Sequence, residues 1–161
     1  MDLYVIRHAD AVPLGENGID NDADRPLTAT GNGQCSHLAE ALLRQGVHLQ
    51  QIITSPLLRS RQTTDGLLKK LTPAPEVQDC KHLAPGGSRR KLTRFLCGLS
   101  AQSVAIVGHA PDLDVYAAWL IGSRKAQLEL AKGGLARIHF EKDPDKGAGV
   151  LTWLVTPQWC Q

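Results

Sequence analysis

Short apolar runs that alternate with helical patterns constrain the fold of this chain more than any other feature. Runs rich in β-branched residues occur at 3–6, 51–54 and 103–107, and each one is followed by a segment with helical spacing of its apolar residues. This alternation predicts a three-layer α/β sandwich with a mostly parallel central sheet. Two further runs, 135–140 and 150–155, flank a turn-forming stretch and predict a hairpin that adds at least one antiparallel strand.

Capping residues mark where the intervening helices begin. Thr28 or Thr30 can cap the first helix, Ser55-Pro56 is expected to open the second, and Ser88 can cap the third. Pro111 suits the first position of a fourth helix, because its fixed φ angle matches a helix and its missing N–H is not needed there. The expected chain is therefore strand and helix in regular succession.

Composition bounds the class of protein. The chain has 161 residues, of which 42% are hydrophobic, so we expect a single domain over residues 1–161. The net charge is only +2 and no basic run is interleaved with aromatics, which argues against nucleic-acid binding. The four cysteines are scattered and no apolar run is long enough to span a bilayer, so we expect a cytoplasmic protein with reduced thiols and no membrane partner. The sequence predicts no oligomeric state.

Basic side chains follow the ends of three predicted strands. The first strand ends at Arg7-His8, the second at Ser55 shortly before Arg59, and the third at Gly108-His109. Parallel strands bring such ends to one edge of a sheet, and Arg25 lies on a long loop, residues 9–27, that leaves this edge. Three arginines and two histidines repel one another unless an anion binds between them. Phosphate is the leading candidate.

Four ordered segments now carry a resemblance to a known family. They are residues 7–10, residues 25–28 with Gly31, residues 55–63 and residues 107–111. In order and spacing they resemble the histidine phosphatase superfamily, also called the phosphoglycerate mutase-like fold. The short chain and the Arg-Pro-Leu-Thr element look most like its SixA-type phosphohistidine phosphatase branch.

The resemblance implies a role for each basic residue. His8 would be the nucleophile that becomes phosphorylated, while Arg7, Arg59 and a protonated His109 would bind the phosphoryl oxygens. Arg25 would join this phosphate-binding set in the SixA-like branch. No metal or other cofactor is implied, and the histidines show no metal-ligand spacing.

Two departures from the family pattern stand out. Ala9 replaces the glycine that commonly follows the Arg-His pair, which is tolerable if the backbone there has a negative φ. In many relatives a carboxylate in the loop after the third strand serves as general acid, but residues 79–85 contain no glutamate. Asp79, His82 and Asp10 are therefore the candidates for a proton donor or an orienting group. A phosphoramidate departs more readily than an alkoxide, and a weak acid would then suffice.

These observations predict a metal-independent phosphatase that acts on phosphohistidine in a signalling phosphotransfer protein. Two alternatives remain open at this point. One is a phosphatase of small phosphate esters, and the other is a non-catalytic module that binds phosphoproteins.

Overall fold

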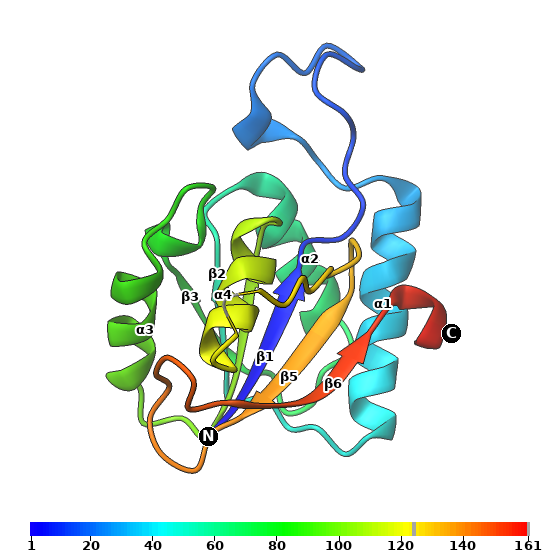
Figure 1. Cartoon of the computed structure of the whole chain (residues 1–161). Coiled ribbons are helices and arrows are strands. Elements are labelled where there is room, and N and C mark those ends of the chain that lie inside the picture. The colour runs from blue at the N-terminus through cyan, green and yellow to red at the C-terminus, as the bar shows by residue number, and fades with distance from the viewer. Residues whose placement is uncertain (124, 161) are drawn as a thin grey trace.

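The computed structural model describes residues 1–123 and 125–160, so residues 124 and 161 of the expected single domain lie outside the described residues. Within the described part, six strands form one mixed sheet with helices on both faces (Figure 1). The strands are β1 (Asp2–Arg7), β2 (Gln51–Thr54), β3 (Glu76–Asp79), β4 (Ser103–Gly108), β5 (Leu135–His139) and β6 (Val150–Val155). The helices are α1 (Ala29–Arg44), α2 (Leu58–Leu68), α3 (Arg89–Cys97) and α4 (Asp112–Leu120), with short 3-10 helices η1 (Asp22–Asp24), η2 (Lys81–Leu83) and η3 (Pro157–Trp159).

The strand order is β3-β2-β4-β1-β5-β6. The pairs β3–β2, β2–β4 and β4–β1 are parallel, whereas β5 is antiparallel to both β1 and β6. This arrangement confirms the predicted α/β fold and its antiparallel hairpin. No helix of the described residues has the length and apolar character needed to cross a membrane.

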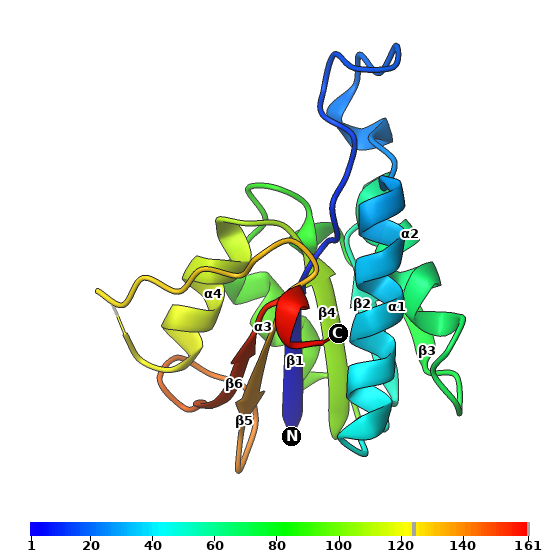
Figure 2. The same ribbon diagram turned by 90° about the vertical axis from the view of Figure 1, so that its right-hand side faces the viewer.

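Alternation along β1 produces the two faces of the sheet. Leu3 and Val5 pack into the core beneath α3 and α4, whereas Tyr4 and Ile6 pack into the core beneath α1 and α2. Figure 2 shows the sheet between these two helix layers. All four side chains are at most 3% exposed, so β1 is a buried central strand, as its continuous apolar run predicts.

The helices begin close to the predicted positions, with two corrections. Thr28 caps α1 by accepting a hydrogen bond from the Gly31 N–H at 3.0 Å, and Ser88 caps α3. The second helix begins at Leu58 rather than at Ser55-Pro56, because the Ser55 N–H donates to the Val107 carbonyl at 2.9 Å and extends the strand pairing by one residue. Pro111 precedes α4 instead of starting it.

Gly31 is required by a close backbone approach. A Cβ atom at this position would lie 2.0 Å from the carbonyl oxygen of Asp10, so no larger residue fits without a shift of the backbone. The segment that leaves β1 therefore packs directly against the first turn of α1.

The topology places the ends of β1, β2 and β4 at one edge of the sheet. Arg7 pairs with Gly108 in the β1–β4 register, and Thr54 pairs with Val107 in the β2–β4 register. The connection after β1 leads to α1 on one face, whereas the connection after β4 leads to α4 on the other, which creates a switch point between these neighbouring strands. Ligands of open α/β sheets bind at such points. The long loop before α1 projects from the same edge (Figures 1 and 2).

Candidate active site

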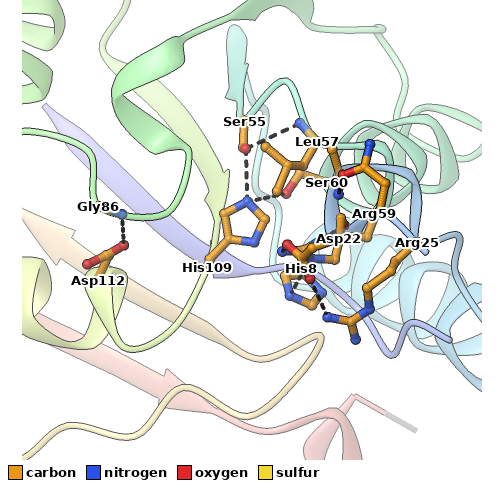
Figure 3. Close-up of polar contacts among 12 residues, drawn as sticks. His8, Asp22, Arg25, Ser55, Leu57, Arg59, Ser60, Gly86, His109 and Asp112 are labelled. Atoms are coloured by element: carbon orange, nitrogen blue, oxygen red, sulfur yellow. Dashed lines mark hydrogen bonds and ion pairs between the residues drawn. The ribbon is translucent and has the colours of Figure 1, made fainter. Parts of the chain in front are cut away.

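His8 is held with one ring nitrogen engaged by the backbone and the other directed at an arginine. Its side chain is 6% exposed, and Nδ1–H donates to its neighbour's carbonyl, Ala9 O, at 2.8 Å. The carbonyl can only accept, so the proton resides on Nδ1 and the lone pair on Nε2. Nε2 accepts a hydrogen bond from Arg59 Nε–H at 3.2 Å (Figure 3). This tautomer is the one that a nucleophilic Nε2 requires.

Burial keeps His8 neutral. Burial, together with the neighbouring charges of Arg59, Arg7 and Arg25 and against the opposing effect of the Ala9 hydrogen bond, lowers the pKa of His8 to about 4. A neutral imidazole at pH 7 has a free electron pair on Nε2. The site therefore presents a nucleophile that needs no general base to activate it.

His109 lies beside His8 at the end of β4. The two ring centroids are 5.1 Å apart, and His109 Nε2 lies 2.9 Å from Ser55 Oγ and 3.5 Å from Ser60 Oγ. Its Nδ1 atom is buried and has no hydrogen-bond partner in the described residues. Burial, followed by the charges of Arg59 and His8, lowers the pKa of His109 to about 3. His109 is therefore neutral in this environment, whereas the family resemblance implies a protonated ring. A bound phosphoryl dianion would have to raise the pKa of His109 before the ring carried a charge.

Arg59 comes from the first turn of α2 and is 4% exposed. Besides the hydrogen bond to His8, its Nη1 donates to the Asp22 carbonyl at 2.6 Å and its Nη2 donates to Asp22 Oδ2 at 3.0 Å. The long loop thus folds back onto Arg59 through η1. The same loop holds Arg25, whose Nη1 donates to Asp22 Oδ1 at 2.9 Å and whose Nε donates to the Val12 carbonyl at 2.7 Å.

Arg7 enters the site from the end of β1. Its Nη1 donates to the Leu130 carbonyl at 2.8 Å, and Asp114 Oδ1 accepts the Leu130 N–H at 3.0 Å. Arg7 Nε is buried without a hydrogen-bond partner among the described residues. Buried polar atoms are nearly always satisfied, so Arg7 Nε and His109 Nδ1 are two nitrogen atoms available to a bound anion.

Within the described residues, none of the three proton-donor candidates forms a hydrogen bond with His8, although Asp10 interacts with it electrostatically. Asp10 accepts hydrogen bonds from Lys132 Nζ and Thr28 Oγ1, both at 2.7 Å, and the first of these bonds lowers the pKa of Asp10. As an ionised carboxylate, Asp10 therefore links its own segment to the segments of Lys132 and Thr28. Asp79 forms an ion pair with Arg61 on the exposed edge strand β3.

His82 lies in η2, half-buried in a recess that Gly87, Asp112 and Tyr116 also line. Within the described part of the chain, no hydrogen bond joins His82, Asp79 or Asp10 to His8. A general acid protonates the leaving group, which departs on the side of phosphorus opposite the nucleophile, so the proton-donor role of these residues stays a prediction.

Ala9 is compatible with the site. Its N–H donates to Thr63 Oγ1 at 3.0 Å and its side chain is fully buried. Among non-glycine residues of the described chain, only Asn17 has a positive φ. The backbone at Ala9 therefore does not need glycine.

Sequence reasoning missed the residues that hold the basic groups in place. Asp22 contacts two of the arginines, Ser60 lies near His109, and Asp114 acts on Arg7 through Leu130. One local feature could have revealed the first of them. Asp22 precedes Arg25 by three residues, a spacing at which opposite charges meet in a helical turn.

Comparison with known proteins decides the family. A model of the histidine phosphatase superfamily (branch 1) matches residues 3–84, which is half of the chain. An uncharacterized protein of Picosynechococcus sp. (strain ATCC 27264 / PCC 7002 / PR-6) is 36% identical, and the alignment covers 99% of this chain and 98% of that protein. The chain belongs to the histidine phosphatase superfamily.

Two further relatives share its full length. Phosphohistidine phosphatase SixA of Escherichia coli (strain K12) is 24% identical over 98% of this chain and 94% of that protein. A solved structure of the protein histidine phosphatase SixA with tungstate superposes with a TM-score of 0.88 at 23% identity, and covers both chains completely. This likeness confirms the phosphoglycerate mutase-like fold. Membership of the superfamily makes the protein a phosphatase.

Proposed function

We propose that this phosphatase is metal-independent, forms a phosphohistidine intermediate on His8, and removes phosphate from phosphohistidine in a signalling phosphotransfer protein. The neutral His8 carries this proposal, because its Nε2 lone pair lies among basic side chains contributed by four separate segments. A nucleophile and a set of phosphate-binding donors in contact are what phosphoryl transfer needs.

The charge of the site matches a phosphoryl group. Arg7, Arg25 and Arg59 contribute three positive charges and Asp22 contributes one negative charge, while the pKa values of His8 and His109, about 4 and about 3, leave both rings neutral. This excess of positive charge among the groups around His8 is what a phosphoryl dianion requires. The charge that a metal ion supplies in other phosphatases is thus supplied here by guanidinium groups.

The reaction has two displacement steps. His8 Nε2 attacks phosphorus, so that the Nε2–P bond forms while the bond from phosphorus to the leaving nitrogen breaks and that nitrogen takes up a proton from solvent water. A phosphoryl oxygen replaces His8 as the acceptor for Arg59 Nε–H, and the unpaired Arg7 Nε and His109 Nδ1 bind the other oxygens. Water then attacks phosphorus and gives up a proton to solvent, which breaks the Nε2–P bond, restores neutral His8 and releases phosphate.

The ionised state of the carboxylate that contacts Arg59 supports a phosphohistidine substrate. Asp22 is the carboxylate nearest in the hydrogen-bond network, but the hydrogen bond from Arg25, followed by that from Arg59, lowers its pKa and keeps it ionised. A carboxylate in this state cannot protonate an alkoxide leaving group. An imidazole leaving group needs less assistance, and the full-length relative SixA of Escherichia coli is named a phosphohistidine phosphatase.

Comparison of substrates tests the proposal. We would measure kcat/KM for a phosphohistidine-containing transfer protein, an aryl phosphate and a sugar phosphate, each with and without EDTA. The proposal expects the phosphoprotein to react fastest and EDTA to have no effect. Faster hydrolysis of the sugar phosphate would favour a phosphatase of small esters instead.

Variants locate the chemistry. His8→Ala is expected to abolish turnover of every substrate, whereas His37→Ala, a histidine of α1 outside the site, is a control that leaves turnover unchanged. Full activity of His8→Ala would refute the proposed nucleophile.

A further inference from the structure

Asp22 makes more contacts with the phosphate-binding arginines than any other side chain of the site. It lies in η1, on the loop that projects from the sheet edge, and its carboxylate is 47% exposed. Oδ1 accepts from Arg25 Nη1, Oδ2 accepts from Arg59 Nη2, and the Asp22 backbone carbonyl accepts from Arg59 Nη1 (Figure 3). One residue thus binds two arginines through three acceptors.

The planar shape of a guanidinium group gives these contacts a direction. The two Nη atoms form the outer end of the group, whereas Nε and Nη2 form a side edge. Asp22 occupies the outer end of Arg59, and Arg59 Nε on the side edge points to His8 Nε2 at 3.2 Å. The side edge therefore faces the nucleophile, and a phosphoryl oxygen can replace His8 Nε2 as the acceptor of Arg59 Nε–H. Asp22 does not have to leave for this to happen.

We propose that Asp22 is a positioning residue for phosphoryl transfer, which fixes the side edge of Arg59 against His8 and links Arg25 to the same unit. The inference rests on the proposed function, because it assigns Arg59 to the phosphoryl group attacked by His8. Asp22 itself touches neither the nucleophile nor the substrate, and it acts through the two arginines.

Its charge makes the proposal testable by separating binding from turnover. In Asp22→Asn the backbone carbonyl of residue 22 still accepts from Arg59 Nη1, but the charged acceptor of Arg59 Nη2 is lost. Asp22→Asn keeps the shape of the side chain but removes one negative charge, so the electrostatic attraction of the site for phosphate increases. A residue that merely stabilised the fold or attracted the substrate would change binding in the opposite direction.

Asp24→Asn is the matched control. Asp24 lies two residues away on the same 3-10 helix, and its carboxylate accepts a hydrogen bond from Asn21 Nδ2 at 2.8 Å. The substitution removes the same charge from the same loop without touching an arginine of the site. Thermal unfolding of both variants would verify that the fold is intact.

The first measurement is kcat together with the dissociation constant of inorganic phosphate. We expect kcat of Asp22→Asn to fall about 10- to 100-fold, the range for a misplaced catalytic group, while phosphate binds equally tightly or more tightly. Asp24→Asn is expected to change neither quantity. The inference is overturned if kcat of Asp22→Asn matches that of Asp24→Asn, or if phosphate binding weakens as much as turnover does.

The second measurement needs no substrate. Hydrogen exchange of Arg59 Nε–H, followed by NMR in the full chain, is expected to be slow in the wild type and in Asp24→Asn, and about tenfold faster in Asp22→Asn because its hydrogen bond to His8 loosens. Equal exchange in all three proteins would overturn the inference. A wild-type protein that releases phosphate from none of the tested substrates would instead refute the proposed function. The exchange measurement would still show whether Asp22 holds Arg59 against His8.

Discussion

Lowering the pH from 7 to 5 will leave the catalytic imidazole of His8 uncharged. Burial, together with the charges of Arg59, Arg7 and Arg25, lowers its pKa from the ordinary 6.5 to about 4. At pH 5 a group with this pKa is about 90% neutral, whereas an imidazole in water is about 3% neutral. This lowering of the pKa corresponds to roughly 3 kcal/mol against the charged form of the ring.

Two assays measure this titration. The kcat/KM for an aryl phosphate, corrected for the ionisation of the substrate, is expected to stay level from pH 7 to pH 5 and to fall below about pH 4. NMR of the His8 ring, assigned with His8→Asn, should give the same midpoint in the protein alone. A midpoint near 6.5 in the folded protein would refute the reasoning, because the ring would then be solvated and unaffected by the arginines.

The same shifts make folding sensitive to acid. In the unfolded chain His8 and His109 bind protons below about pH 6.5, whereas in the folded chain they do so only near their pKa values of about 4 and about 3. The contribution of these two histidines to the free energy of unfolding is therefore complete above pH 6.5 and decreases as the pH falls toward 4. Urea unfolding at several pH values checks this, and His109→Asn should reduce the pH dependence. A dependence unchanged in that variant would contradict the account.

Three further substitutions test separate parts of the structure. Arg59→Lys is expected to lower kcat/KM about 100-fold, because an ammonium group cannot bind Asp22 and point at the nucleophile together. Arg61→Lys, an exposed position on the same helix, is the control, and equal effects of the two substitutions would contradict the assignment. Gly31→Ala is expected to destabilise the fold by about 1–3 kcal/mol in urea unfolding, since its Cβ would lie 2.0 Å from a carbonyl oxygen, and a change under about 0.5 kcal/mol would refute this. His82→Ala should leave kcat within about twofold at every pH, and a lost basic limb of the pH profile would identify it as the proton donor after all.

The strands and the convergence of their ends were predictable because both depend on local patterns. Each buried strand is a short run of apolar residues, and parallel pairing then places residues 7–8, 55 and 108–109 at one edge whatever the details of the helices. Arg25 was predictable in the same way, because a loop that starts at this edge has few other places to return. Family resemblance added the roles of the basic residues, not their arrangement.

The contacts that hold the basic residues in place depend on partners far apart in the sequence. Asp22 meets Arg59 across 37 positions, and Lys132 meets Asp10 across 122 positions. A loop without apolar periodicity gives no indication of which distant side chain it will contact. The start of α2 was predicted too early for a related reason. The N–H of Ser55 donates to the Val107 carbonyl of the neighbouring strand β4, and the local sequence does not reveal this pairing.

Trapping of the intermediate tests the central claim most directly. Wild-type protein mixed with a phosphohistidine-containing transfer protein and quenched within milliseconds is expected to carry an acid-labile phosphoryl group on His8, bonded to Nε2 because Nδ1–H donates to the backbone. The phosphorus NMR signal of the quenched protein distinguishes the two nitrogens. A turning-over enzyme that never carries phosphate on His8, or that carries it on another residue, would contradict the account.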